Sequence, residues 1–257
     1  MMAPGLGFPA LWSLRAFSDL QGMVERFQPG ARKITRYPIK YLRYWFVRHF
    51  LETHARNLGR PLRILEVGVD RGQMLAFMGS AEQRATFVES WSAIDVAPDE
   101  RWLASLGYSD VRRMNVDRGA DPCLDKNYDA MVFLHVLEHL EEPEPTLRAF
   151  ARYMGNDTLI VGGAPTMPKI VADLGYENRL RQNAKRFGHV SVISPERIEQ
   201  FVEDEGLSLK FLSGAFLMRK QGSAIENSSL WMRFNLAYGA LFPSLASEVY
   251  FVLQKSR

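Results

Sequence analysis

The chain has 257 residues, which suits one α/β domain with additional segments and allows a large hydrophobic core. Its one cysteine, Cys123, excludes a framework of intrachain disulfides, and no run of apolar residues reaches the length that spans a bilayer. The formal net charge is only +3, yet residues 1–60 hold ten Arg and Lys against three Asp and Glu. A segment this basic favours contact with phosphates, membrane surfaces or acidic substrates, although a solvated helix face would carry the same charges.

Two helices are predicted in the first quarter of the chain. The first spans Ala10–Phe27, where apolar residues fall roughly on one side. The second starts at Pro38 and runs to Leu58, and its aromatic side chains are interleaved with Lys and Arg. Such interleaving can bind nucleic acid or a partner, but it is more typical of a helix that turns an aromatic stripe to the core. We therefore treat residues 1–60 as a helical extension of the domain that follows at 61–257.

The segment Arg63–Gly72 is the most informative part of the chain. It begins with a short apolar run, as in a strand buried on both faces, and glycines follow at Gly68 and Gly72. A helix is predicted from Gln73 to Ser80. A strand, a glycine turn and a helix in this order let a nucleotide-like ligand approach backbone N–H groups without a side chain in the way.

Two kinds of cofactor are compatible with such a turn. A dinucleotide fingerprint, Gly-x-Gly-x-x-Gly, would require glycines at positions 70 and 73, where the chain has Asp70 and Gln73. The spacing instead resembles motif I of the class I S-adenosylmethionine-dependent methyltransferases, acid-x-Gly-x-Gly-x-Gly. Glu66, Gly68 and Gly72 match this motif, and Asp70 replaces its middle glycine. Asp tolerates left-handed backbone conformations better than most residues, so the turn can survive the replacement.

Two acids follow the next predicted strands. Asp95 stands at the carboxyl end of the strand Phe87–Ile94, where an acid can accept hydrogen bonds from a ribose diol. Asp117 follows the strand Val111–Val116, and the resemblance implies that it contacts the adenine amine of S-adenosylmethionine. A turn-capping role is the alternative for Asp117, since Asp commonly caps turns.

A fourth strand is predicted at Asp129–Leu134, and it continues into the segment His135–Leu140. This stretch is similar to the signature that follows strand four in small-molecule methyltransferases of the ubiquinone-biosynthesis type. On this basis we include Leu134 and His135 among the cofactor-binding residues. We expect the helix that follows to break at Pro143 and to restart at Pro145, running to Met154.

The same stretch permits a different chemistry. His135, Glu138 and His139 spell His-x-x-Glu-His, which one group of zinc peptidases uses. That use requires both histidines on one face of a stable helix and a third ligand downstream. Because His135 ends a predicted strand, we expect no metal site here and keep a metallopeptidase as the alternative.

A fifth strand is predicted at Thr158–Val161, and residues 166–188 after it combine helix-like content with many charges. A segment at this place lies over the ligand crevice of an α/β sheet, so we predict a substrate lid. Methyl transfer from a sulfonium needs donor and acceptor held in line, and a hydroxyl acceptor also needs a base. His189 is our candidate base, because Gly-His-Val-Ser resembles the histidine that many family members carry before the next helix, and His135 is the second candidate. A structural hydrogen bond is the alternative role for His189.

Two further strands are predicted at Leu207–Met218 and Val249–Leu253, with an apolar helical insertion at about 230–245 between them. Together with the basic and aromatic stretch at 32–50, this insertion could form a peripheral membrane surface or a homodimer contact. Burial of both stretches against the sheet is the competing explanation.

The whole sequence predicts an α/β protein with a Rossmann-like sheet of seven mostly parallel strands and helices on both faces. The resemblance implies S-adenosylmethionine as cofactor and a small-molecule, glycan or lipid-linked acceptor, methylated at a hydroxyl oxygen. Nucleic acid is a poor acceptor candidate, because the chain lacks a Pro-Pro-aromatic motif after strand four. A non-catalytic cofactor-binding subunit is a further alternative. The N-terminus has no basic start followed by an apolar block, so we expect a cytoplasmic protein, with peripheral membrane contact as an alternative.

Overall fold

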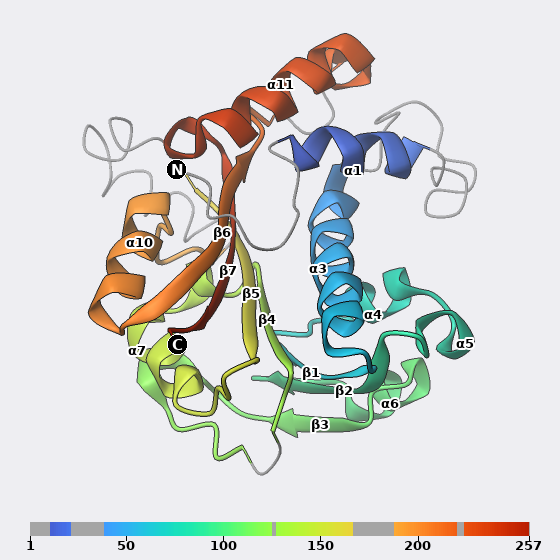
Figure 1. The fold of residues 1–257 in the computed structure, drawn as a ribbon, viewed down its shortest axis with the longest axis vertical. Helices are drawn as coiled ribbons and strands as arrows, with labels where there is room; N and C mark the ends of the chain where they lie inside the picture. Colours follow the sequence, from blue (N-terminus) through green and yellow to red (C-terminus); the bar gives the residue numbers. More distant parts are fainter. Residues whose placement is uncertain (1–10, 22–38, 125–126, 167–187, 220–223, 257) are drawn as a thin grey trace.

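The computed structural model describes residues 11–21, 39–124, 127–166, 188–219 and 224–256 of the chain. They form a seven-stranded sheet in the order β3-β2-β1-β4-β5-β7-β6 (Figure 1). The strands are β1 (Leu62–Val67), β2 (Val88–Asp95), β3 (Asp110–Arg113), β4 (Ala130–Leu134), β5 (Leu159–Pro165), β6 (Leu207–Ala215) and β7 (Glu248–Lys255). β7 runs antiparallel to β5 and β6, and the other neighbouring pairs are parallel. The predicted fold class is confirmed.

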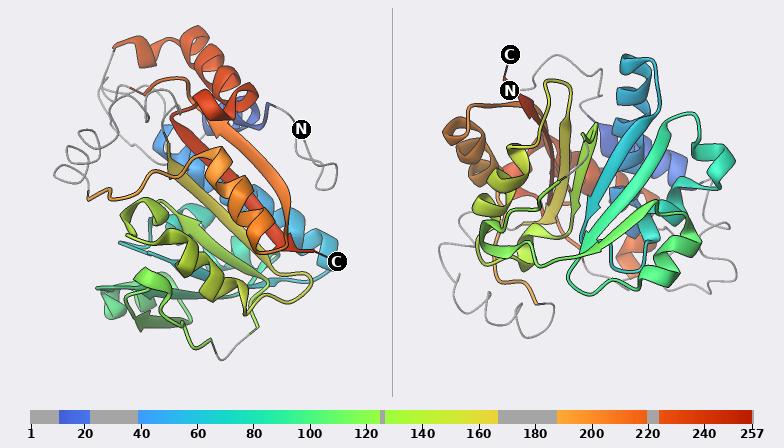
Figure 2. Two further views of the ribbon diagram at one scale, coloured as in Figure 1. Left: turned by 90° about the vertical axis from the view of Figure 1, so that its left-hand side faces the viewer. Right: turned by 90° about the horizontal axis from the view of Figure 1, so that it is seen from below.

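Helices cover both faces of this sheet (Figures 1 and 2). They are α1 (Trp12–Gln21), α3 (Leu42–Leu58), α4 (Gln73–Met78), α5 (Ala81–Arg84), α6 (Glu100–Leu106), α7 (Pro143–Ala151), α10 (Pro195–Asp204) and α11 (Ser229–Leu241). Short 3-10 turns are η1 (Ile39–Tyr41), η2 (Asp117–Gly119), η3 (Leu137–His139), η4 (Ala224–Asn227) and η5 (Pro243–Leu245). One core cluster joins α1, α3, α4, α6 and α11 to one face, and a second cluster joins α7 and α10 to the other.

The central strand β1 shows why the sequence is continuously apolar there. Alternate side chains of a strand point to opposite faces, so Ile64 enters one core cluster while Leu65 and Val67 enter the other. Glu66 shares the face of Ile64, which places a carboxyl group inside a hydrophobic layer. A strand buried on both sides brings the glycine turn that follows it to the centre of the sheet edge.

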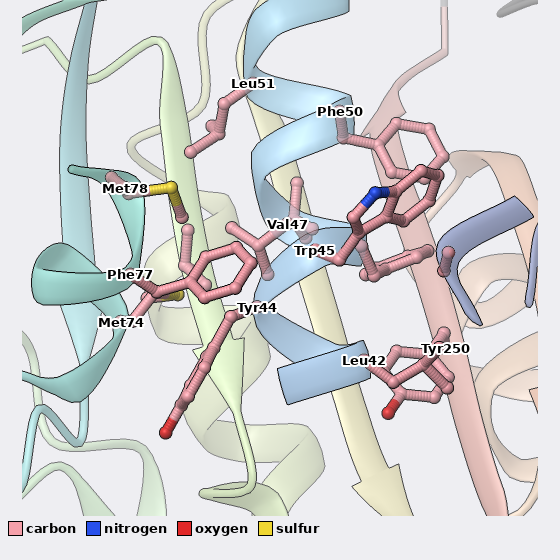
Figure 3. Close-up of a cluster of buried hydrophobic side chains, with 14 of the residues drawn as sticks. Leu42, Tyr44, Trp45, Val47, Phe50, Leu51, Met74, Phe77, Met78 and Tyr250 are labelled. Carbon is pink, nitrogen blue, oxygen red and sulfur yellow. The ribbon is translucent and has the colours of Figure 1, made fainter. Parts of the chain in front are cut away.

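The N-terminal helices fill one core with aromatic rings (Figure 3). On α3, Trp45 and Phe50 are buried, and the ring centroid of Phe46 lies 4.8 Å from that of Tyr250 on β7. From α1, the indole Nε1 of Trp12 donates a hydrogen bond of 3.0 Å to a serine hydroxyl of β6. The aromatic side chains of α3 therefore pack against the sheet. For this helix, burial in the core is observed, which was the alternative to a membrane surface or a dimer contact.

Several predicted boundaries are wrong, for identifiable reasons. Pro143 starts α7 instead of breaking a helix, because the first turn needs no N–H from it. β5 continues past the predicted end at Val161 through a glycine pair to Pro165. A Cβ on Gly162 would lie 2.1 Å from Cζ of Phe251, so this glycine makes room for a ring from β7 and does not form a turn.

Some predictions fall outside the described residues. The predicted lid at 166–188 is described only at its two ends, and the basic run at 32–36 and the end of the first predicted helix at 22–27 are not described. Among the helices that are described, none combines the length and the hydropathy needed to cross a bilayer.

Candidate functional site

Two adjoining cavities open at the carboxyl ends of β1, β2 and β4. The strand order reverses between β1 and β4, and ligands of open α/β sheets bind at such a switch point. The larger cavity has a volume of about 530 Å³ and the smaller one about 250 Å³. Gly68, Asp70, His135 and His139 line both of them, so the two cavities meet along these residues.

The glycine turn between β1 and α4 requires its glycines for two reasons. Gly68 and Gly72 have φ angles of 73° and 70°, which L side chains rarely adopt. A Cβ on Gly68 would also lie 2.3 Å from Cγ2 of Val136. Asp70 takes a left-handed φ of 48°, so the acid at the position of the missing glycine does hold the turn.

Asp95 ties the glycine turn to β2. One carboxylate oxygen accepts a hydrogen bond of 3.1 Å from the backbone N–H of Asp70, and the other accepts one of 2.9 Å from that of Ala97. Two of about four acceptor sites are thus used inside the protein. Asp95 lines the larger cavity beside Ile94 and Val96, so the remaining sites are available to a ligand there.

Asp117 has a structural role in addition to its position at the larger cavity. Its carboxylate accepts hydrogen bonds from the backbone N–H groups of Arg118, Glu141 and Glu142, at 2.8, 3.0 and 3.3 Å. These bonds anchor the segment that joins η3 to α7. The hydrogen bonds of Asp117 are thus those of a turn-capping residue. Asp117 also lines the larger cavity.

Glu66 lines the smaller cavity but is nearly fully buried. Its Oε2 accepts hydrogen bonds from Tyr108 Oη at 2.8 Å and from Trp91 Nε1 at 2.9 Å. Burial raises the pKa of the carboxyl group to about 8, even though both hydrogen bonds act to lower it. Burial, followed by the nearby Glu66 carboxyl, also raises the pKa of Tyr108. Glu66 is therefore largely protonated near neutral pH.

His135 and Leu134 end β4 at the junction of the two cavities. His135 has a left-handed φ of 57°, and its backbone N–H donates a hydrogen bond of 2.7 Å to the carbonyl of Gly163 on β5. Its Nδ1 lies 3.3 Å from Oε1 of Glu138, whose carboxylate is buried and makes no hydrogen bond among the described residues. Leu134 lines the smaller cavity. The strained turn thus brings the imidazole to the crevice.

His139 and His189 meet beside this carboxylate, although 50 positions separate them in the sequence. Their ring centroids are 4.9 Å apart, and Nδ1 of His139 lies 3.1 Å from the carbonyl oxygen of Gly188. Burial lowers the pKa of His189, so its imidazole is neutral near pH 7. The structure therefore places His189 next to a residue that lines both cavities.

The metallopeptidase alternative finds little support in this arrangement. Ligand atoms of Glu138, His139 and His189 lie within 4.8 Å of one another and could hold a metal ion, but this group does not include His135. The peptidase motif requires a stable helix, whereas Leu137–His139 is a single 3-10 turn.

Among the residues of the smaller cavity that were not predicted as site residues, three polar ones come from helices. Arg43 and Tyr44 come from α3 and Gln73 from α4. Tyr44 Oη donates to Oε1 of Gln73 at 3.2 Å, and a nitrogen of Arg43 donates to Tyr44 Oη at 3.3 Å. The Arg43 Nε is buried and makes no hydrogen bond among the described residues. In the sequence, Arg43 is one of several Lys and Arg residues interleaved with aromatic residues on the same predicted helix. Only the packing shows that it lines the cavity.

A family model described as "Methyltransferase domain" matches residues 39–210, which is more than half of the chain. The chain belongs to this methyltransferase family. This methyltransferase matches no curated protein sequence. The family assignment favours methyl transfer over peptide hydrolysis.

Solved structures with the same fold agree with the assignment. The plantazolicin methyltransferase BamL, solved in complex with a triazolic desmethylPZN analog and SAH, is similar with a TM-score of 0.54 and 13% identity over 98% of this chain and 100% of that one. BpumL, a plantazolicin methyltransferase in complex with SAH, gives 0.53 and 16% over 95% and 99%. A proposed sarcosine dimethylglycine methyltransferase from Galdieria sulphuraria gives 0.58 and 14% over 93% and 98%. At these identities the likeness establishes the fold.

Proposed function

We propose that this methyltransferase moves a methyl group from S-adenosylmethionine to a hydroxyl oxygen of a small-molecule, glycan or lipid-linked acceptor. The observation that carries the proposal is that two cavities meet at Gly68. The larger one has acidic and apolar groups that suit a nucleoside, and the smaller one has basic groups. The plantazolicin methyltransferases of the same fold were solved with SAH, the product of this cofactor.

The residues present fit the cofactor. The larger cavity lies in the size range of ligand sites in proteins, and the free acceptor sites of Asp95 suit a ribose diol. We assign the remaining acceptor capacity of Asp117 to the adenine amine. In the smaller cavity the guanidinium group of Arg43 suits a carboxylate, so we assign the amino acid end of the cofactor to it. When bound, the cofactor would supply a methyl group on a positively charged sulfur, and this sulfur leaves readily as a neutral thioether.

The histidines provide the proton acceptor that a hydroxyl group requires. A neutral imidazole can take the proton, and the lowered pKa of His189 keeps it neutral at the pH of most cells. His135 lies at the junction of the cavities and is the second candidate. The protein's main contribution is to hold both partners in line, since effective molarities for oriented groups are large.

Calorimetry tests the cofactor assignment. We expect S-adenosylmethionine and S-adenosylhomocysteine to bind, and NAD not to bind. Asp95→Ala should weaken both by about 1–3 kcal/mol through lost hydrogen bonds to a charged group. Glu89→Ala, which removes an exposed carboxylate from the opposite end of the same strand, is the matched control and should bind as the wild type does. Failure of both sulfur nucleotides to bind would refute the proposal.

A further inference from the structure

Five exposed apolar side chains lie on α11 and on the turn η5 that follows it. Its members are Leu230, Phe234, Leu241, Phe242 and Leu245, with exposed fractions of 79, 53, 55, 50 and 38%. Within the helix their spacing of four and seven residues places them on one side. We refer to these five side chains as the α11 outer face.

Aromatic rings run along this helix in close succession. The ring centroids of Trp231 and Phe234 are 5.9 Å apart, those of Phe234 and Tyr238 6.1 Å, and those of Tyr238 and Phe242 4.9 Å. Trp and Tyr, which combine an apolar ring with a polar group, favour the boundary between lipid and water.

The opposite face of α11 is locked against β6, so the helix cannot rotate to bury its outer face. A Cβ on Gly239 would lie 2.4 Å from the backbone nitrogen of Phe216, which shows that helix and strand touch at the backbone. The side-chain amide of Asn235 also donates to the carbonyl of Met218 and accepts from its N–H, both at 2.9 Å. The α11 outer face is therefore exposed as a consequence of the fold.

The charges around this face suit an anionic surface. Residues 227–247 contain no Asp or Glu, and their one cation, Arg233, is exposed and lies 5.6 Å from the ring centroid of Phe17 on α1. Arg15 of α1 is exposed as well, and the single acid of that helix, Asp19, accepts a hydrogen bond from a tryptophan indole. Figure 1 shows α1 beside α11 at one end of the molecule. A second copy of the chain fits less well, because an isologous contact would bring these like charges together.

The same segment leads directly to the sheet edge that holds the candidate site. The 3-10 turn η5 is followed by Glu248, which begins β7 and pairs with Pro165 at the carboxyl end of β5. His135 is bound through its backbone to Gly163 of the same strand. A surface seated on α11 and η5 would thus adjoin the edge where the acceptor must enter.

We propose that the α11 outer face docks on an anionic lipid bilayer. Its apolar side chains enter the interfacial region, and Arg233 and Arg15 contact lipid phosphates. One consequence of this inference rests on the proposed function: if the protein transfers methyl groups, its acceptor belongs to the lipid-linked class.

Co-sedimentation with vesicles tests the docking surface. The full chain should sediment with phosphatidylcholine vesicles that contain phosphatidylglycerol, and markedly less with phosphatidylcholine alone or at high salt. Phe234→Glu with Phe242→Glu should lower the partition coefficient at least about tenfold, because each ring loses its transfer from water. Trp102→Glu is the control for an added charge: it places one glutamate, against two in the double variant, at an aromatic side chain of α6 that is 50% exposed, and it should sediment as the wild type does.

Three results would overturn the inference. The first is the absence of vesicle binding at every composition and salt concentration. The second is vesicle binding that the double variant retains, and the third is a dimer in sedimentation velocity that only the double variant abolishes. Binding of S-adenosylhomocysteine by the variants shows that they are folded, and its binding by the wild type tests the cofactor assignment. If the wild type does not bind S-adenosylhomocysteine, the proposed function is refuted, and the vesicle result still stands.

Discussion

Glu66 makes the stability of the protein depend on pH in a predictable direction. Burial raises the pKa of its carboxyl group from 4.5 to about 8 in the folded protein, whereas the unfolded chain has no such burial. Between these two pKa values the unfolded state loses the proton and the folded state keeps it. The contribution of Glu66 to stability is therefore complete below about pH 4.5 and is lost as the pH rises to about 8.

The size of the effect follows from the linkage relation. One proton kept by the folded state corresponds to about 1.4 kcal/mol per pH unit, or about 4 kcal/mol between pH 5 and pH 8. Glu66→Gln removes the titration and keeps an acceptor for Tyr108 and Trp91. We expect the free energy of unfolding of this variant, relative to the wild type, to rise by about this amount over that range.

Urea denaturation of the cofactor-free protein at constant ionic strength measures this difference. The comparison of variant with wild type cancels the titration of the histidines, which both proteins share. Glu89→Gln, on the exposed end of β2, should show a difference that does not change with pH. If the difference for Glu66→Gln stays constant within about 0.5 kcal/mol from pH 5 to pH 8, the raised pKa assigned to the buried carboxyl group is contradicted.

Three further changes test other parts of the structure. His189→Ala should lower kcat for methyl transfer strongly and leave the dissociation constant for S-adenosylhomocysteine within about twofold; unchanged turnover from pH 6 to 9 would assign the base elsewhere. Arg43→Met should weaken S-adenosylhomocysteine binding about tenfold or more by removing a charge-assisted bond, and unchanged calorimetric affinity would exclude the assigned contact. Gly239→Val should destabilise the protein by about 3 kcal/mol or more in urea denaturation, because its side chain meets the backbone of Phe216. Gly59→Ala, at a helix end with nothing within 4 Å of a Cβ, should cost only about 1 kcal/mol, and an equal loss in both variants would contradict the close approach of α11 to β6.

The sequence by itself determined the elements whose signals are local. The apolar run before Gly68, the turn that follows and the position of Asp95 at a strand end are all visible in a window of about thirty residues. The start of α10 is another case: Ser194 caps the helix by accepting a hydrogen bond from the N–H of Arg197, and Pro195 follows in the first turn, and both residue types are favoured at these positions. Such features depend on backbone preferences and strand periodicity, which act between near neighbours. The resemblance to methyltransferases could be found for the same reason, because motif I lies in one such window, and the family model that matches residues 39–210 confirms the family.

Only the tertiary structure decided which distant groups meet and which surfaces stay exposed. The protonation of Glu66 results from its burial, and the hydrogen bonds from Tyr108 and Trp91, which reach it from other parts of the chain, act against it; the sequence offers no sign of this environment. The meeting of His139 with His189 likewise depends on how the chain returns to the sheet edge after β5. The aromatic stripes of α3 and α11 look alike in the sequence, yet one is buried and the other is half exposed. An amphipathic pattern shows that a helix has an apolar side, but the packing of the whole chain determines whether anything covers it.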